Sequence, residues 1–347
     1  MTSPQTTPAE IPPEVAASQH VFQIATGYIA STALYVAVKL GIADRLGDGV
    51  RPIAELARET GATEDALYRV LRLLSSVGLF AETQPGVFGH TPASSFLRTG
   101  RPESVHHMAL WIPDPFHLRV YADAMHSVMT GEPAIDKTFG KPAFEYLKGD
   151  RELSEVFNNA MTSFSAFVIP AVLEAYDFSG IDLLVDVAGG HGHVITSILQ
   201  RYPGMRGVLF DVDHVIAGAI PRIRAMGLEE RVATQSGNFF ESVPEGGDAY
   251  VMKHIIHDWD DERATTILTN IGRVMNPQGH VILLESVLQP ANTPDFGKLI
   301  DLEMMLIPGG RERTEAEFRS LLERAGFTLR RVIPTASPLS VIDAVRA

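Results

Sequence analysis

One segment constrains the fold of this chain more than any other, the run Asp-Val-Ala-Gly-Gly-His-Gly at 186–192. It follows an apolar stretch at 183–187 and precedes a stretch with helical character at 194–200. A second apolar stretch, 207–210, ends in Asp211. A strand, a Gly-rich turn, a helix and a second strand tipped with a carboxylate are typical of the nucleoside-binding half of a doubly wound sheet. The glycines let the backbone approach a ligand closely, and Asp211 can accept hydrogen bonds from two ribose hydroxyls.

The order of residues in this turn indicates which nucleoside it suits. A dinucleotide site usually reads Gly-x-Gly-x-x-Gly, with a helix N-terminus facing a pyrophosphate. Here a carboxylate, Asp186, stands at the end of the first strand, where it would repel a pyrophosphate and attract a cation. S-adenosylmethionine carries an ammonium and a sulfonium and no phosphate, so the electrostatics favour it over a nicotinamide dinucleotide. The alternative is a tight turn without a ligand, and the spacing of Asp211 argues against it.

The composition is that of a globular protein with room for two domains, since 45% of its 347 residues are hydrophobic and 20% are charged. The net charge of −13 argues against a nucleic-acid partner, which needs a basic surface. The chain has no cysteine, which excludes disulfides, a thiol nucleophile and a thiolate metal site. Residues 1–17 are rich in Pro and Thr, and we expect a disordered tail rather than a signal peptide. No apolar run approaches the length of a membrane span, so we expect a cytoplasmic enzyme with no membrane partner.

Residues 18–112 are expected to form a helical, winged-helix-like domain. Two amphipathic stretches, 53–57 and 64–77, predict helices, and a turn at 84–86 between two apolar runs predicts a β-hairpin. This arrangement suggests DNA binding, but residues 1–112 hold 8 basic and 10 acidic side chains and so lack a basic surface, which favours a structural use. The preceding stretch, 28–46, is apolar on nearly every face, which predicts a buried helix covered by a partner subunit.

Residues 113–347 are expected to hold linking helices, up to about residue 178, and then a catalytic domain in which strands and helices alternate. The expected strands are 183–187, 207–210, 232–236, 249–252 and 281–285, and the expected helices are 193–202, 215–225, 262–275 and 315–325. Two further strand-like runs, 328–334 and 340–346, predict a terminal antiparallel hairpin. The expected fold is therefore α/β: a doubly wound, Rossmann-like sheet of the methyltransferase type, whose hairpin distinguishes it from dehydrogenase sheets.

The run Lys-His-Ile-Ile-His-Asp-Trp at 253–259 follows the expected strand 249–252, at the carboxyl end where doubly wound sheets bind their ligands. Two later acids bear on His257: Glu285 ends the next strand, and Glu312 lies in the loop before the next helix. A His between two carboxylates is oriented and made more basic, which suits a general base. The alternatives are a plain surface His and a metal site, and no third ligand for a metal is evident beside the two histidines.

Together these motifs resemble the class I O-methyltransferases of the plant caffeate and flavonoid type and their bacterial natural-product relatives. The resemblance rests on the Gly-rich run, the Phe-Asp pair at 210–211, the Lys-x-x-x-His-Asp-Trp run and the run Pro-Gly-Gly-Arg-Glu-Arg-Thr at 308–314. It covers the chain from about Ile29 to the C-terminus, and the last two runs are highly specific as a pair. It implies a metal-independent enzyme that uses S-adenosylmethionine, with an N-terminal winged helix that forms an intertwined homodimer and has no DNA function.

The resemblance also implies a role for the matching residues. His257 is the catalytic base, and Glu285 and Glu312 steer it. The residues assigned to the cofactor are Ser165, Asp186, Ala188, Gly189, Gly190, Gly192, Asp211, Val212, Asn238, Phe239 and Lys253. Among them, Asp186 and the Gly-rich turn bind the methionyl moiety, Asp211 the ribose and the Asn238-Phe239 pair the adenine. The residues assigned to an apolar, flat substrate are Phe157, Met161, Asp258 and Met304, although Phe157 and Met161 also suit plain core packing.

Two residues depart from the family pattern. Ala188 replaces the first glycine of the turn, which is tolerable if its φ is negative but would narrow the pocket. Asn238 replaces the usual acid beside the adenine, and its carbonyl oxygen can still accept from the adenine amine. We therefore predict methyl transfer to a phenolic or enolic hydroxyl, with His257 as the base. The alternatives are a relative that keeps the cofactor but catalyses hydroxylation or decarboxylation, and a winged-helix regulator with a ligand-binding sheet.

Overall fold

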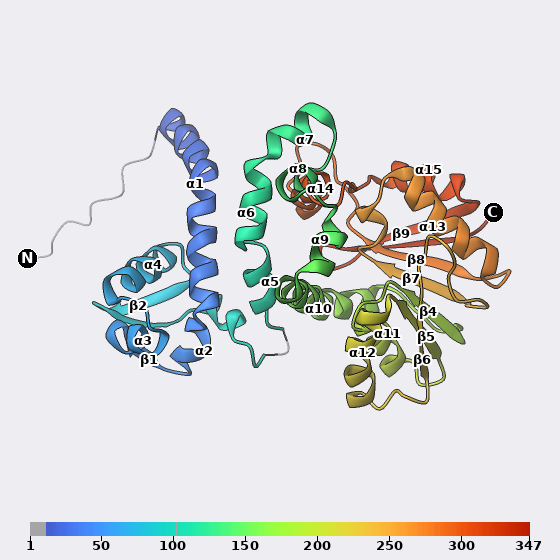
Figure 1. Ribbon diagram of the computed structural model, residues 1–347, viewed down its shortest axis with the longest axis horizontal. Helices are drawn as coiled ribbons and strands as arrows, with labels where there is room; N and C mark the ends of the chain where they lie inside the picture. Colours follow the sequence, from blue (N-terminus) through green and yellow to red (C-terminus); the bar gives the residue numbers. More distant parts are fainter. Residues whose placement is uncertain (1–11, 102) are drawn as a thin grey trace, which may run out of the picture. The chain divides into compact units, whose positions relative to one another are not determined.

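The computed structural model describes residues 12–101 and 103–347. The chain divides into two compact units between Asp114 and Pro115, two residues beyond the expected boundary after residue 112 (Figure 1). Each unit has a hydrophobic core of its own.

The first unit combines helices with a small sheet. Its helices are α1 (Pro13–Lys39), α2 (Ile42–Leu46), α3 (Ile53–Thr60), α4 (Glu64–Ser76) and α5 (His106–Trp111), with a 3₁₀ turn η1 (Ser94–Leu97). Its strands are β1 (Val50–Pro52), β2 (Phe80–Gln84) and β3 (Val87–His90), in the order β1-β3-β2. The expected hairpin is formed by β2 and β3. The sequence did not reveal β1, because a strand of three residues is too short to show a periodicity.

The stretch 28–46 forms parts of two helices rather than the single helix expected. Gly41 adopts a left-handed conformation with φ of +63°, which a right-handed helix cannot include, so α1 ends before it and α2 begins after it. Upstream, α1 begins at Pro13. Residues 13–17, expected in the tail, are therefore helical, and residues 1–11 lie outside the described part of the chain.

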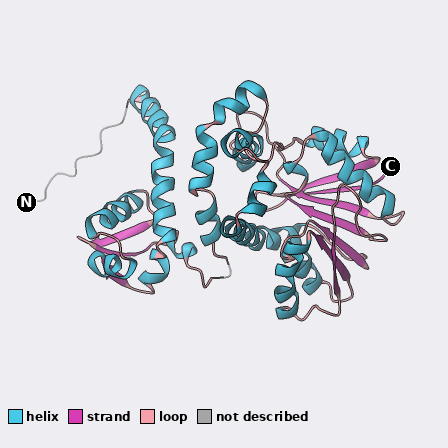
Figure 2. Cartoon of the chain, in the orientation of Figure 1, coloured by secondary structure: helices cyan, strands magenta, loops and turns pink. Residues whose placement is uncertain are grey.

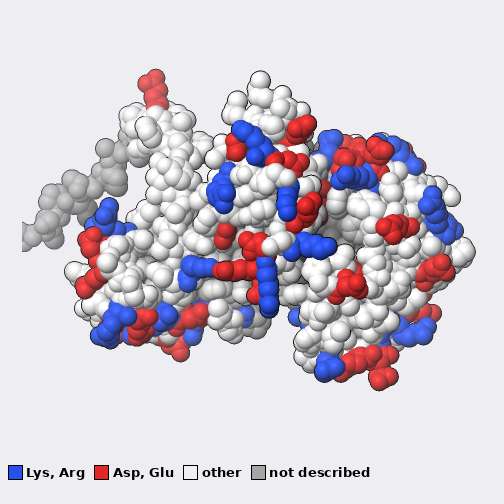
Figure 3. Space-filling view, in the orientation of Figure 1, with Lys and Arg blue, Asp and Glu red and all other residues white. Residues whose placement is uncertain are grey.

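The N-terminal half of α1 is not covered by its own unit. The buried side chains of α1 are Ala33, Ala37 and Val38, all in its second half. Phe22 and Ile24, in its first half, are each 70% exposed. The visible face of α1 is almost entirely free of charged side chains in Figure 3. An exposed apolar face of this extent marks an interaction surface.

Two helices, α1 and α10 (Arg151–Ala175), are long and apolar enough to cross a membrane by length and composition alone. This finding corrects the expectation that no apolar run reaches such a length. In α10, however, Phe164, Val168 and Val172 are buried inside the second unit together with the polar Ser165. Their burial is that of a core helix in a folded domain.

The second unit is built on a seven-stranded sheet. Its strands are β4 (Leu183–Val187), β5 (Arg206–Asp211), β6 (Val232–Ser236), β7 (Ala249–Lys253), β8 (His280–Glu285), β9 (Phe327–Pro334) and β10 (Ser340–Arg346). Its helices are α6 (Pro115–Ala122), α7 (Ala124–Thr130), α8 (Ala134–Phe139), α9 (Ala143–Gly149), α10, α11 (His193–Arg201), α12 (Asp213–Ala225), α13 (Asp261–Val274), α14 (Phe296–Leu306) and α15 (Glu315–Arg324), with a 3₁₀ turn η2 (Ile256–Asp258).

The strand order of this sheet is β6-β5-β4-β7-β8-β10-β9. The first five strands in this order are parallel, and the terminal hairpin β9-β10 is antiparallel, as expected. Helices cover both faces of the sheet (Figure 2). The order reverses between β4 and β7, so the connections leave their carboxyl ends in opposite directions and open a crevice there.

Candidate active site

A cavity of about 590 Å³ lies at the carboxyl ends of β4, β5 and β7. Its volume falls within the range of about 300–1,000 Å³ that is typical of small-molecule sites. Most of the residues assigned to the cofactor line it: Ser165, Ala188, Gly189, Gly190, Asp211, Val212, Asn238, Phe239 and Lys253. The substrate residues Phe157, Met161 and Asp258 line the same cavity. Asp186, Gly192 and Met304 are not on its wall.

Asp186 lies beneath the Gly-rich turn. Its side chain is 1% exposed, and its Oδ2 accepts a hydrogen bond from the N–H of Ile195 in α11. The turn passes so close that a Cβ on Gly189 would lie 2.6 Å from the Cγ of Asp186, which explains the glycine there. Burial raises the pKa of Asp186 to about 7. Asp186 therefore shapes the turn, and it repels an anion less than the fully ionised carboxylate assumed from the sequence.

Ala188 does not have the negative φ that we expected would make an alanine tolerable at this position. Its φ is +55°, in the left-handed region that favours glycine. A residue with a Cβ is disfavoured there by about 1–2 kcal/mol. The strained residue follows β4 directly and lies on the cavity wall. Backbone strain of this kind concentrates at ligand sites, where the surrounding structure holds it in place.

Asp211, at the end of β5, is oriented by two backbone N–H groups. Its Oδ2 accepts from Gly190 at 2.8 Å, and its Oδ1 accepts from Val212 at 2.7 Å. Each oxygen keeps a second lone pair, so the carboxylate can still accept hydrogen bonds from a ribose diol. Burial raises the pKa of this carboxyl above its usual range.

Asn238 is partly engaged by its own turn. Its Oδ1 accepts from the N–H of Phe240 at 3.1 Å, and its Nδ2 donates to Glu241 at 3.0 Å. Oδ1 can accept one further hydrogen bond, and its assignment to an adenine amine stays a prediction.

Beside Asn238 stands an aromatic wall, of which the sequence had assigned only Phe239 to the cofactor. The ring of Trp259 lies edge-on to Phe240 and Phe239, at 4.8 and 5.9 Å between centroids, and Phe144 of α9 lies 5.7 Å away. All four rings line the cavity. The Nε1 of Trp259 is buried and has no hydrogen-bond partner among the described residues. A flat heterocycle with acceptor nitrogens fits such a wall. Trp259, the last residue of the 253–259 run, was the sequence feature that could have indicated this aromatic wall.

The structure brings the three expected catalytic residues together. The Nδ1 of His257 lies 2.6 Å from the Oε1 of Glu312 and 3.9 Å from the Oε2 of Glu285. His257 is 5% exposed, and both glutamates are buried. None of the three lines the cavity directly. Asp258 does, and its Oδ1 lies 3.4 Å from the Nε2 of His257.

The two glutamates hold His257 in different ways. Glu312 contacts the imidazole itself. Glu285 uses its Oε1 to accept the N–H groups of Ile255 and Ile256, at 3.1 and 2.9 Å. Glu285 therefore fixes the backbone that leads into η2, whereas Glu312 fixes the orientation of the ring.

Burial raises the pKa of every carboxyl group around this imidazole. The pKa rises to about 7 for Glu285 and Asp258 and to about 8 for Glu312. For Glu312, the negative charge of Asp301 adds to the effect of burial, and the guanidinium of Arg313 opposes it. Near neutral pH the cluster therefore carries fewer negative charges than it has carboxyl groups.

Glu285 supplies the third candidate metal ligand, which the sequence did not place beside His254 and His257. Ligand atoms of His254, His257 and Glu285 lie within 4.8 Å of one another. The two imidazoles are stacked, however, with centroids 4.3 Å apart and planes at 26°, and His254 also stacks on Phe164. Ring nitrogens bind metals in the plane of the ring, so an ion shared by stacked rings would lie outside the plane of at least one. This geometry favours the metal-independent proposal.

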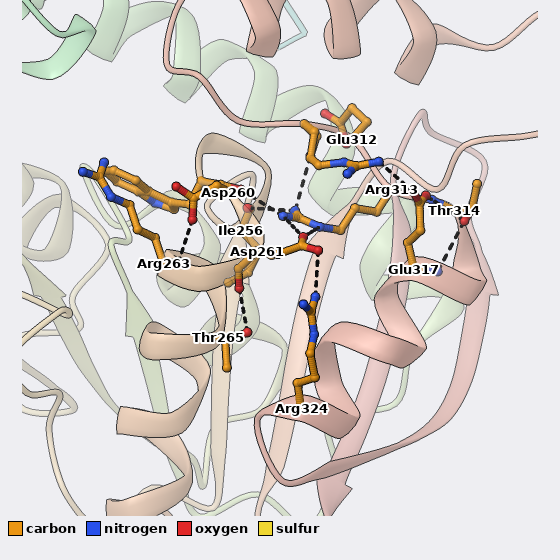
Figure 4. Close-up of polar contacts among 12 residues, drawn as sticks. Ile256, Asp260, Asp261, Arg263, Thr265, Glu312, Arg313, Thr314, Glu317 and Arg324 are labelled. Carbon is orange, nitrogen blue, oxygen red and sulfur yellow. Dashed lines mark hydrogen bonds and ion pairs between the residues drawn. The ribbon is translucent and has the colours of Figure 1, made fainter. Parts of the chain in front are cut away.

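A buried arginine holds the turn that carries the expected base (Figure 4). The side chain of Arg313 is 1% exposed and donates to the carbonyl oxygens of Ile256 and Trp259, at 3.1 and 2.9 Å. It also donates twice to Asp261, at 3.0 and 2.8 Å. The other oxygen of Asp261 accepts from Arg324 of α15. Sequence reasoning missed Arg313, although it lies in the quoted 308–314 run.

The backbone of the 308–314 loop approaches the same turn. The N–H of Arg311 donates to the carbonyl oxygen of His257 at 2.8 Å, and a Cβ on Gly310 would overlap that oxygen. The N–H groups of Gly309 and Gly310 donate to the carbonyl oxygen of Met304, at 2.9 and 3.1 Å. Met304 thus anchors this loop through its backbone, and its buried side chain is not on the cavity wall where the sequence had placed it.

Comparisons with known proteins identify these motifs. A family model described as an O-methyltransferase domain matches residues 121–328, and one described as an O-methyltransferase dimerisation domain matches residues 22–100. The chain belongs to the O-methyltransferase family.

Relatives of this O-methyltransferase cover nearly its whole length. Phenazine O-methyltransferase PhzM of Lysobacter antibioticus is 43% identical over 94% of this chain and 96% of its own. The mitomycin biosynthesis 6-O-methyltransferase of Streptomyces lavendulae is 35% identical over 96% of this chain and 95% of its own. The sequence resemblance is thereby confirmed.

Solved structures of similar proteins confirm the fold. The crystal structure of LaPhzM has a TM-score of 0.92 at 42% identity and covers 97% of this chain and 100% of that one. The structure of CalO1, a methyltransferase in calicheamicin biosynthesis, was solved with S-adenosylhomocysteine bound. It has a TM-score of 0.85 at 33% identity and covers 97% of this chain and 100% of that one. This O-methyltransferase uses S-adenosylmethionine as its methyl donor.

Proposed function

We propose that this O-methyltransferase methylates a hydroxyl group of an aromatic small molecule, with His257 as the general base. The observation that carries the assignment is the 2.6 Å contact between His257 and Glu312, buried directly behind the cavity. Phenazine, which gives one relative its name, is a flat aromatic system and supports an aromatic acceptor. Both relatives are named methyltransferases, which favours methyl transfer over the hydroxylation or decarboxylation alternatives.

The residues of the cavity fit S-adenosylmethionine. Asp211 would hold the ribose, the aromatic wall around Trp259 would hold the adenine, and the turn at 188–192 would hold the methionyl moiety. When bound, the cofactor supplies an electrophilic methyl group on its sulfonium. The residues of the chain must bind the acceptor and remove the proton of its hydroxyl group.

His257 can accept the proton of the acceptor hydroxyl only through Nε2, because Glu312 occupies Nδ1. For Nε2 to carry a free lone pair, Nδ1 must hold the hydrogen and donate it to an ionised Glu312. A free phenol has a pKa of about 10, against about 6.5 for His, so proton removal must accompany the attack of the oxygen rather than precede it. Asp258, beside Nε2 and on the cavity wall, is the proposed substrate contact nearest to the base.

Replacing His257 by Ala tests this proposal. Loss of a general base is expected to lower kcat by about 10²–10⁴-fold, while the affinity for S-adenosylhomocysteine stays within a few-fold. The transfer of a labelled methyl group to a panel of bacterial aromatic polyketides measures kcat, and calorimetry measures the affinity. His280→Ala is the matched control, since His280 also pairs with a buried acid, Asp343 at 2.7 Å, but at the opposite end of β8. A His257→Ala enzyme that keeps most of its kcat at neutral pH would contradict the role.

We further propose that residues 18–112 form the dimerisation domain of a homodimer and that residues 113–347 form the linking helices and the catalytic domain. The match to a dimerisation-domain model over residues 22–100 supports the homodimer, and the exposed face of α1 supports its interface. The burial of α10 and the biosynthetic relatives support a soluble enzyme, which we assign to the cytoplasm.

A further inference from the structure

His191, in the middle of the Gly-rich turn, lies on the wall of the cofactor cavity next to Asp211. Its imidazole packs against Gly218 of α12. A Cβ on Gly218 would lie 2.6 Å from the Nε2 of His191, 3.0 Å from its Cδ2 and 3.4 Å from its Cε1. The ring therefore occupies the space that any other residue at position 218 would fill.

The glycine at position 218 is unfavourable for the helix that contains it. It lies inside α12, where alanine would favour the helix by about 1 kcal/mol. Its backbone does not need glycine, because its φ is not positive. The contact with His191 accounts for the glycine, which indicates that the position of this ring matters.

The imidazole of His191 has hydrogen-bonding capacity to spare. Neither ring nitrogen makes a hydrogen bond to another residue in the described part of the chain. Burial lowers the pKa of His191; the carboxylate of Asp211 opposes this effect, and the guanidinium of Arg222 adds to it. A neutral imidazole offers one N–H donor and one acceptor.

The neighbouring carboxylate of Asp211 indicates which ligand group the N–H of His191 can bind. Asp211 is an acceptor that already takes one backbone N–H on each oxygen, and it has room for the two hydroxyl hydrogens of a ribose. A diol that donates both hydrogens in this way presents its own oxygen lone pairs to a donor. We propose that the His191 imidazole donates a hydrogen bond to the ribose of S-adenosylmethionine, beside Asp211, and that Gly218 holds the ring in place for it. The proposal rests on the cofactor site and is independent of the acceptor and of the base.

Calorimetry with S-adenosylhomocysteine and with 5′-methylthioadenosine tests the contact. The second ligand keeps the adenine and ribose and lacks the amino-acid moiety. His191→Ala is expected to weaken both ligands by about ten-fold, the value of one hydrogen bond. Unchanged affinity for both would overturn the proposal. A loss confined to S-adenosylhomocysteine would also overturn it, because the contact would then be to the methionyl moiety.

Gly218→Ala tests whether the contact with Gly218 positions the His191 imidazole, without altering the imidazole itself. The new methyl group is expected to displace the imidazole and to weaken both ligands about as much as His191→Ala does, while the thermal midpoint does not fall. In the His191→Ala background the same substitution should have no further effect, since no ring is left to displace. Gly204→Ala is the matched control, because a Cβ there meets no atom within 4 Å and its φ is not positive. A Gly218→Ala protein with wild-type affinity for both ligands would contradict the seating.

Discussion

Glu312 bears more directly on the base than Glu285 does. It touches the ring nitrogen of His257, so its ionisation decides which ring nitrogen carries the hydrogen. Glu285 binds backbone N–H groups through an oxygen that a glutamine would retain. Two carboxylates that look equivalent in the sequence thus have separable roles.

Glu312→Gln is expected to lower kcat by about 10²–10⁴-fold, because the amide can donate to Nδ1 and leave the hydrogen on Nε2. Glu285→Gln should lose much less, since its carbonyl can still accept the two N–H groups. Affinity for S-adenosylhomocysteine should stay near wild type in both. Methyl-transfer assays and calorimetry measure these quantities, and equal losses of kcat in the two variants would contradict the division of roles.

The pH dependence of the wild-type enzyme follows from the same residue. Burial raises the pKa of Glu312 to about 8, and the base is competent only when this carboxyl is ionised. Activity is therefore expected to rise with pH through about 7 to 8 and to fall below that window. A profile of kcat against pH for wild type checks this, and a rate independent of pH between 6 and 9 would exclude Glu312 as the controlling group.

Ala188 offers a stability test at the residue scale. Ala188→Gly relieves a left-handed backbone conformation, which offsets the added flexibility of the unfolded chain, so the variant should be as stable as wild type or up to about 1 kcal/mol more stable. Ala217→Gly, on the exposed face of α12, is the control and should cost about 1 kcal/mol. Denaturant unfolding measures both. Equal destabilisation by the two changes would show that position 188 carries no strain.

At the scale of elements, the loop at 308–314 and the turn at 256–261 work as one unit. Arg313 binds carbonyl groups on either side of His257, and Arg311 binds the carbonyl group of His257 itself. The carbonyl group of Trp259 is one of those bound, and its ring lines the cavity. The proposed base and the aromatic wall of the cavity therefore share a single anchor.

Arg313→Lys is expected to reduce kcat by about ten-fold or more and to lower the free energy of unfolding by about 2 kcal/mol, because an ammonium cannot reproduce the planar set of donors. Arg324→Met is the control: it removes an exposed partner of the same Asp261 and should cost less than about 1 kcal/mol. Steady-state kinetics and thermal unfolding compare them. If Arg313→Lys shifted stability alone, with kcat and its pH profile unchanged, Arg313 would be structural only.

The local sequence pattern predicted the strands that are short apolar runs bounded by turns. The strands from β4 to β8 are found to within one residue at each end, because short apolar runs between turns have few alternatives. Helix α14 was not expected, since Asp301 and Glu303 interrupt its apolar positions and neighbouring helices stabilise it. The break at Gly41 went unseen for a related reason: one residue in a left-handed conformation leaves no periodic signal.

The candidate site divides in the same way. Residues inside recognisable runs, such as His257 and Asp211, could be proposed for the site from sequence, and their roles stay predictions. The aromatic neighbour Phe144 and the anchoring role of Arg313 depend on contacts between segments more than 50 residues apart, which no local pattern encodes. The conformation of Ala188 likewise required the backbone itself.

At the scale of the whole molecule, α1 leaves an apolar surface that one unit does not cover. Phe22→Glu should disrupt a homodimer, because a charge would then replace an apolar contact in the interface. Val77→Glu is the control, since Val77 is 59% exposed in the same unit but lies outside α1. Sedimentation at micromolar concentration measures the oligomeric state. A dimer that survives Phe22→Glu unchanged would place the interface elsewhere.

The buried acids around the cavity also couple cofactor binding to the release of protons. A cationic ligand lowers the pKa of nearby carboxyl groups, and those of Asp186, Asp258, Glu285 and Glu312 lie near 7 to 8 without one. Binding of the sulfonium cofactor should therefore expel protons, and by reciprocity its affinity should rise with pH. S-adenosylhomocysteine lacks the sulfonium charge and should expel fewer. Calorimetry in buffers of different ionisation enthalpy counts these protons, and equal counts for the two ligands would contradict the coupling. Methyl transfer would then remove the positive charge that strengthens cofactor binding. The reaction itself would therefore lower the affinity of the site for its product, S-adenosylhomocysteine.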